Sequence, residues 1–178
     1  MNKDLIEQYK IVHSKQSGYG NNFGKGRYFD EMVEFLKSNN CNSVLDFGCG
    51  KGSLRRKLWE EGFVCDGYDP AVEVFSSFPS QNYDAVVSTD VFEHLDEENI
   101  SDEFDLIKSV KPKFLYFNVA TGKAGQILPC GINAHTIVKE PEWWENIILE
   151  SFQNFDLCEQ FFQSSVGAAS VTFALKKK

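Results

Sequence analysis

A glycine-rich turn directly after a short apolar segment is the feature that most restricts the fold of this chain. Residues 43–47 read Ser-Val-Leu-Asp-Phe, which is typical of a buried strand, and residues 48–52 follow as Gly-Cys-Gly-Lys-Gly. A helical pattern then runs over residues 53–61 and ends at Gly62. A strand that passes through such a turn into a helix predicts a βαβ unit and therefore a parallel sheet.

The remainder of the chain continues this alternation of strands and helices. Strands are predicted at residues 63–68, 83–88, 113–118, 155–161 and 170–176, and helices at residues 28–37, 97–108 and 141–149. The last two strands are close enough in sequence to form an antiparallel hairpin. The order predicts an α/β fold with a mostly parallel sheet, helices on both faces and a C-terminal antiparallel hairpin.

The chain has 178 residues, which fits a single domain over residues 1–178 with its core at residues 28–178. Residues 1–27 are polar, with a short helix predicted at residues 4–12. Glycine and asparagine then crowd together at Gly18, Gly20, Asn21, Asn22, Gly24 and Gly26. Glycine at this density disfavours both helix and strand, so we expect an N-terminal loop or lid.

The charge of the chain argues against a nucleic-acid partner. The formal net charge is −8, and only the terminal residues 176–178 form a basic run, which a solvated tail explains. A protein that neutralises phosphates along a nucleic acid usually has a basic face instead. No apolar run approaches the about 20 residues of a membrane helix, and the first residues lack the apolar core of a secretion signal. We therefore expect a cytoplasmic protein without a nucleic-acid or membrane partner.

The cysteines give no sign of a disulfide framework or a metal centre. They are Cys41, Cys49, Cys65, Cys130 and Cys158, which are odd in number, widely spaced and free of any Cys-x-x-Cys pair. We expect reduced thiols and no metal site.

A ligand site is predicted where the glycine turn meets the next strand. In open parallel sheets ligands bind at the carboxyl ends of the strands, where backbone amides of the turn and a helix N-terminus come together. A side chain at Gly48 or Gly50 would block close approach of a ligand. Asp69 ends the next strand, where a carboxylate can accept both hydroxyls of a ribose. Asp46 suits a cationic group better than a pyrophosphate, although a tight turn without any ligand is the alternative.

These segments resemble the motifs of class I S-adenosylmethionine-dependent methyltransferases. Residues 44–52, Val-Leu-Asp-Phe-Gly-Cys-Gly-Lys-Gly, are similar to the first motif of that family. Residues 67–70, Gly-Tyr-Asp-Pro, match its ribose-binding acidic position, and residues 83–94 resemble its fourth-strand motif. The resemblance implies a Rossmann-like fold and S-adenosylmethionine as the cofactor. The residues it implies for cofactor binding are Asp46, Phe47, Gly48, Cys49, Gly50, Gly52, Asp69, Pro70, Thr89 and Asp90.

One segment departs from the family pattern. Residues 70–82 are too few for the usual helix and strand and for the acidic residue that contacts adenine, so we expect the third strand region to be shortened. Phe75 or Phe78 stacking on the adenine is one hypothesis, and packing of these rings in the core is the alternative.

Two histidines are candidates for catalysis. His94 lies just past the fourth strand of the family fold, beside the position where the resemblance implies the methyl group, and it could act as a base for a hydroxyl acceptor. Capping of the next helix is the alternative for His94. His135 lies in a long segment after residues 113–118, and such segments are often functional, but a surface histidine held by a loop fits equally. His13, together with Tyr9 and Tyr19, could approach the cofactor from the lid.

The sequence thus predicts a methyltransferase for a small-molecule or sugar-like acceptor, modified at oxygen. Residues 88–91, Ser-Thr-Asp-Val, differ from the Asn/Asp-Pro-Pro-aromatic motif of enzymes that methylate exocyclic amines. Two alternatives stay open: a non-catalytic partner subunit that keeps the cofactor fold, and a nucleotide-dependent enzyme on a similar sheet. The sequence leaves the oligomeric state open.

Overall fold

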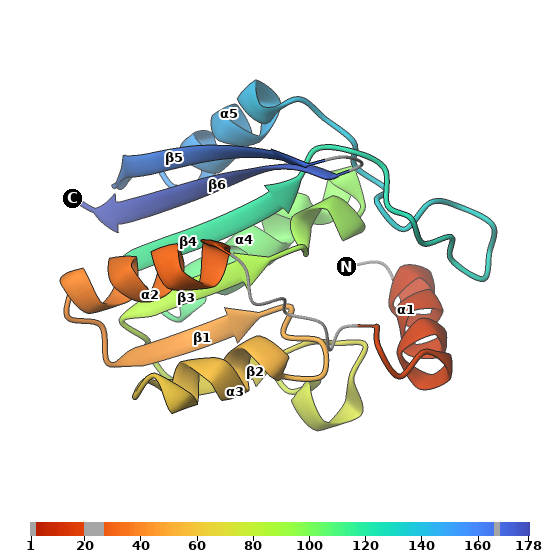
Figure 1. Cartoon of the computed structure of the whole chain (residues 1–178), viewed down its shortest axis with the longest axis horizontal. Helices are drawn as coiled ribbons and strands as arrows, with labels where there is room; N and C mark the ends of the chain where they lie inside the picture. Colours follow the sequence, from red (N-terminus) through yellow and green to blue (C-terminus); the bar gives the residue numbers. More distant parts are fainter. Residues whose placement is uncertain (1–2, 20–26, 166–167) are drawn as a thin grey trace.

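The computed structural model describes residues 3–19, 27–165 and 168–178, and Figure 1 shows the arrangement of their elements. Within these residues six strands form one sheet in the order β2-β1-β3-β4-β6-β5. The strands are β1 (Ser43–Phe47), β2 (Val64–Tyr68), β3 (Ala85–Thr89), β4 (Phe114–Ala120), β5 (Phe155–Ser165) and β6 (Ala168–Lys177). The first four are parallel, and β6 runs antiparallel to both β4 and β5. The predicted sheet with its C-terminal hairpin is confirmed.

Helices cover both faces of the sheet. On one face α2 (Arg27–Ser38) and α3 (Ser53–Glu60) pack over β1 to β4. On the other face α4 (Ile100–Ser109) and α5 (Pro141–Ser151) pack over β1, β3, β4 and β6. Successive strand residues point to opposite faces, so Val44 is buried under α2 and α3 whereas Leu45 faces the second layer. A strand that is buried on both faces has apolar residues at nearly every position. This burial explains why residues 43–47 do not alternate between polar and apolar side chains.

The shortened segment forms no strand. Between β2 and β3 the described chain contains only the 3-10 turn η1 (Glu73–Phe75), as predicted for residues 70–82. Because β2 and β3 are parallel strands on either side of β1, this segment already has to carry the crossover between them. A further strand would need a second crossover of a dozen or more residues, for which the chain has no room.

Two predicted elements have different limits in the structure. The helix expected over residues 97–108 starts as the 3-10 turn η3 (Glu97–Asn99) and becomes α-helical at Ile100. The hairpin strands extend well past residues 161 and 170, with a bulge between Leu157 and Glu159. Pairing along the hairpin prolongs β5 through residues 162–165 and starts β6 at Ala168, beyond the segments that the sequence predicts as strands.

The N-terminal helix α1 (Lys3–Lys15) lies beside the carboxyl ends of the parallel strands (Figure 1). Its apolar residues Leu5, Tyr9 and Val12 are buried against Ala71 and the segment that joins β4 to α5. Most of the glycine-rich part of the predicted lid, residues 20–26, lies outside the described residues. Among the residues that the structure describes, no helix is long and apolar enough to cross a membrane.

Candidate active site

A cavity of about 1020 Å³ lies between the carboxyl ends of β1, β2 and β3 and the helix α1. Nearly all the site residues predicted from the sequence line it. These are Asp46, Phe47, Gly48, Cys49, Gly50, Asp69, Pro70, Thr89, Asp90, His94 and His135. Gly52 is the exception, since it precedes α3 at the N-cap position and does not reach the cavity wall.

The glycine turn is fixed by the backbone of the neighbouring strand. The N–H groups of Gly48 and Cys49 both donate to the Tyr68 carbonyl, at 2.7 and 3.0 Å. Gly48 and Gly50 have φ angles of +77° and +53°, which L side chains rarely adopt. A Cβ atom at Gly48 would also lie 2.3 Å from Cγ2 of Val91. Backbone conformation therefore favours glycine at both positions, and close packing requires it at Gly48 as well. The turn leaves its main chain open to the cavity.

Asp69 is oriented by two backbone amides. Its Oδ2 accepts a hydrogen bond from the Gly50 N–H at 2.9 Å, and its Oδ1 accepts one from the Ala71 N–H at 2.8 Å. The residue is buried but lines the cavity. A carboxylate has about four acceptor positions, so each oxygen keeps one for a ligand. Asp69 can thus hold a pair of hydroxyl groups while it fixes the glycine turn.

Asp46 is a buried acid on the cavity wall. Its Oδ2 accepts a hydrogen bond from the Arg55 N–H in the first turn of α3, at 3.1 Å. Burial raises the pKa of Asp46 to about 7, with the charge of Asp69 adding to the rise and the Arg55 amide opposing it. A cation bound in the cavity would stabilise the ionised form of this carboxyl.

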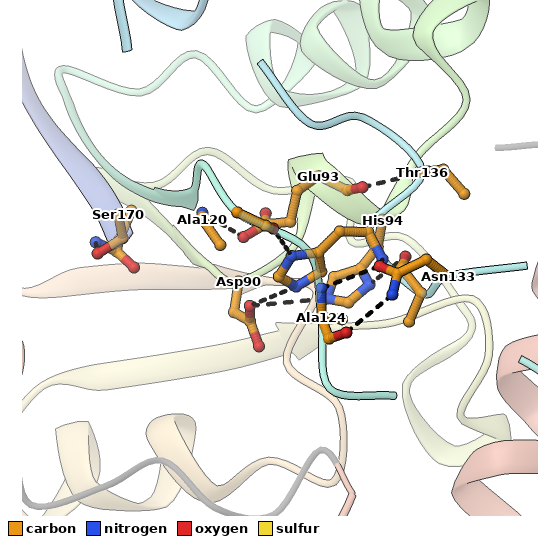
Figure 2. A network of polar contacts seen from close by, with 12 residues as sticks. Asp90, Glu93, His94, Ala120, Ala124, Asn133, Thr136 and Ser170 are labelled. Carbon is orange, nitrogen blue, oxygen red and sulfur yellow. Dashed lines mark hydrogen bonds and ion pairs between the residues drawn. The ribbon is translucent and has the colours of Figure 1, made fainter. Parts of the chain in front are cut away.

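Asp90, His94 and His135 all line the same cavity, and Figure 2 shows the side chains of Asp90 and His94 facing each other within a network of polar contacts. Asp90 follows β3 with a φ angle of +59°, His94 ends the 3-10 turn η2 (Phe92–His94), and His135 comes from the segment after β4. Oδ1 of Asp90 lies 3.7 Å from Nε2 of His94 and 3.6 Å from Nε2 of His135. Two histidines that the sequence suggested separately thus form one cluster with a predicted cofactor residue.

Backbone carbonyls hold both imidazole rings from behind. Nδ1 of His94 lies 2.9 Å from the Ala134 carbonyl and 3.0 Å from the Tyr9 hydroxyl, and Nδ1 of His135 lies 2.5 Å from the Gly122 carbonyl. Burial lowers the pKa of His135, but the nearby Asp90 carboxylate and the hydrogen bond to the Gly122 carbonyl outweigh burial and raise the pKa overall. His135 is therefore disposed to take up a proton.

Glu93 is a functional candidate that the sequence reasoning did not identify. It is fully buried, its Oε1 accepts a hydrogen bond from the Ala120 N–H, and its Oε2 has no hydrogen-bond partner among the described residues. Burial raises the pKa of Glu93 well above its ordinary value, and the neighbouring Asp90 charge raises it further. Its position directly before His94 was the available signal, but burial could not be read from that position.

The walls of the cavity bring together residues from distant parts of the sequence. Tyr9, His13 and Tyr19 line it from the N-terminal side, and their approach to the cofactor stays a prediction. Five polar wall residues carry no signal in the sequence: Glu103, Asn118, Lys123, Gln126 and Ser170. The two rings proposed to stack on adenine do not line this cavity. Phe75 packs against Gly52, and Phe78 packs edge-on against Tyr68 with the ring centroids 4.9 Å apart.

Comparison with known proteins places this geometry in a family. A family described as a methyltransferase domain matches residues 21–164. No curated protein sequence matches the chain. Among solved structures, magnesium protoporphyrin IX methyltransferase from Synechocystis PCC 6803, crystallised with S-adenosylhomocysteine, is similar with a TM-score of 0.70 and 18% identity. That alignment covers 96% of this chain and 100% of the other.

Two other solved structures share the fold. The 1,6-didemethyltoxoflavin N1-methyltransferase of Burkholderia thailandensis has a TM-score of 0.68 and 13% identity, over 98% of this chain and 88% of its own. The methyltransferase domain of bacterial CtHen1 has a TM-score of 0.63 and 18% identity, over 83% of this chain and 96% of its own. The family match agrees with the glycine turn and the paired acidic residues. The chain therefore belongs to the methyltransferase-domain family and has the fold of class I S-adenosylmethionine-dependent methyltransferases.

Proposed function

We propose that this protein transfers a methyl group from S-adenosylmethionine to an oxygen atom of a small or sugar-like molecule. The observation that carries the proposal is the position of the Asp90, His94 and His135 cluster. It shares one cavity with the glycine turn and with Asp69. A cofactor site and a group able to handle a proton thus face the same space, as transfer to a hydroxyl requires.

The residues of the turn fit the cofactor. Gly48 and Gly50 leave the main chain open to a ligand, and Asp69 retains acceptor positions for the hydroxyl groups of a ribose. Asp46 is a buried carboxyl on the same wall, which suits the cationic methionyl end. The same carboxyl would repel a pyrophosphate, so these contacts favour S-adenosylmethionine over a nicotinamide dinucleotide.

The reaction needs alignment and a proton acceptor more than covalent assistance. S-adenosylmethionine supplies a methyl group whose C–S bond breaks with both electrons passing to sulfur while an acceptor lone pair forms the new O–C bond. The protein holds acceptor and methyl group in line and excludes water. The hydroxyl proton passes to Nε2 of His135 or His94, and Asp90 stabilises the imidazolium that results.

The dimensions and lining of the cavity support a small polar acceptor. Ligand cavities commonly measure about 300 to 1,000 Å³, so a cavity of about 1020 Å³ has space for the cofactor and a modest second molecule. Asn118, Ser170 and Gln126 contribute polar groups to its wall. The net charge of −8 argues against a long nucleic-acid acceptor.

The first experiment is calorimetric titration with S-adenosylmethionine and S-adenosylhomocysteine, followed by transfer of a labelled methyl group to matched hydroxyl and amine acceptors. We expect micromolar binding and label on the hydroxyl compounds. Label on amines or RNA alone would contradict the proposed acceptor. Binding without transfer to any acceptor would favour the non-catalytic partner subunit. Thermal stabilisation by a nicotinamide dinucleotide instead would contradict the cofactor.

A further inference from the structure

We propose that Asp90, His94 and His135 bind a divalent first-row transition-metal cation. Atoms of these three side chains that can ligate a metal all lie within 4.8 Å of one another. Spacing of the cysteines led us to expect no metal site, and the histidines are too far apart in sequence to form a ligand motif. Only the folding of residues 90–94 against residues 122–135 produces the cluster.

The hydrogen bonds behind the two rings define what the rings present to Asp90. A carbonyl oxygen can only accept a hydrogen bond, so Nδ1 of each ring carries a proton that it donates to Ala134 or Gly122. In the neutral imidazole the remaining nitrogen, Nε2, then has a free lone pair. Both Nε2 atoms face Oδ1 of Asp90. Metal-bound histidines almost always donate their second N–H to a carbonyl or carboxylate in this way.

The distances suit shared coordination better than direct hydrogen bonding. The two Nε2 to Oδ1 separations are 3.7 and 3.6 Å, longer than the roughly 2.7 to 3.2 Å of an N–H···O hydrogen bond. Ligand atoms about 2.0 to 2.2 Å from a tetrahedral metal are about 3.4 Å apart. Two separations of this length, with the three candidate ligand atoms all within 4.8 Å of one another, leave a position between them for a cation.

A second acidic residue lies beside the cluster. Glu93 is adjacent to His94 in the chain, is fully buried, and has an Oε2 atom without a hydrogen-bond partner among the described residues. A buried polar atom without a hydrogen-bond partner is costly. Asp90 itself faces the cavity, so a cation could reach the cluster from solvent.

The ligand set selects the class of cation. Imidazole nitrogens suit zinc, cobalt, iron and related metals, whereas magnesium and calcium prefer oxygen ligands throughout. Three protein ligands also leave a coordination position open, as catalytic metal sites do.

The role of the cation, though not its binding, rests on the function proposed above. An acceptor hydroxyl at the open position would have its pKa lowered by the cation. Its proton would then leave to water, and the resulting oxygen would attack the methyl group. With the cation bound, the histidines would act as ligands, and the proton that they accept in the metal-free protein would go to water instead.

Metal binding can be measured without any methyl acceptor. Protein without a histidine tag is stripped with a chelator and titrated with Co²⁺, which reports its geometry by visible absorption, and then with Zn²⁺ by calorimetry. The variants are Asp90→Asn and His135→Gln. Asparagine tolerates the positive φ angle of residue 90, and glutamine keeps a polar side chain at residue 135. His13→Gln is the matched control because His13 lines the cavity outside the cluster.

We expect one equivalent of Co²⁺ and Zn²⁺ to bind the original protein, with at least tenfold weaker binding to each cluster variant and unchanged binding to His13→Gln. Absence of binding in the folded original protein, or equal binding in the cluster variants, would overturn the proposal. Thermal unfolding checks each variant, and either one suffices if the other fails to fold. S-adenosylhomocysteine is titrated in parallel, so loss of the cofactor site and loss of the metal site are distinguished.

Discussion

The buried carboxyl of Asp46 offers a sharp test of how the site is built. Because burial places its pKa at about 7 in the native protein, against about 4 in an unfolded chain, ionisation of Asp46 opposes folding. Each pKa unit corresponds to about 1.4 kcal/mol, so the cost reaches about 4 kcal/mol above pH 7. Asp46→Asn removes this cost while its amide oxygen can still accept the hydrogen bond from Arg55.

The sign of the effect fixes its pH dependence. Between about pH 4 and pH 7 the native protein binds more protons at residue 46 than the unfolded chain, so the original protein loses stability as pH rises. The asparagine variant has no such loss. Its advantage in unfolding free energy should therefore grow by about 2 to 3 kcal/mol from pH 5 to pH 8 and level off above pH 7. The buried amide N–H₂ subtracts about 1 kcal/mol at every pH.

Urea unfolding followed by tryptophan fluorescence at pH 5, 6, 7 and 8 measures this difference, because Trp144 is fully buried. The control is Asp105→Asn, which changes an exposed aspartate paired with Lys108 and should have little effect at any pH. The same Asp46→Asn protein should bind S-adenosylmethionine about 1 to 3 kcal/mol more weakly, since the cofactor loses a charged partner. An advantage that is equal at pH 5 and pH 8, or absent at pH 8, would refute the reasoning.

Three further substitutions test the cavity. Asp69→Asn leaves one of two backbone amides, the N–H of Gly50 or that of Ala71, without an acceptor. S-adenosylhomocysteine should therefore bind at least tenfold more weakly in calorimetry, and unchanged affinity would contradict the ribose assignment. Gly48→Ala places a Cβ atom against Val91 at a positive φ angle, and we expect scanning fluorimetry to report a melting temperature lower by several degrees and no cofactor response. Tyr9→Phe removes a buried hydrogen bond of 2.7 Å worth about 1 kcal/mol, so limited proteolysis should cut α1 faster, and an unchanged rate would argue against α1 as a stable cover.

The sequence predicted the glycine turn and the acidic residues beside it because their signals are local. Residues 43–52 combine a buried strand, a glycine turn and a helix start within one short stretch, and Asp69 follows the next strand. Backbone conformation makes such stretches readable, since positive φ angles at Gly48 and Gly50 exclude most other residues. The same locality made the six-stranded core and the missing third strand predictable.

The cluster of Asp90, His94 and His135 could not be predicted, because these residues come together only through tertiary packing. His94 and His135 are both visible in the sequence, but nothing in their spacing indicates that their Nε2 atoms face one carboxylate oxygen. The burial of Glu93 and the hydroxyl of Tyr9 against His94 depend on how α1 and the segment after β4 fold over the sheet edge. Strand and turn identity follow from neighbouring residues in the chain, whereas the distances and charges that decide chemistry follow from contacts between residues far apart in sequence.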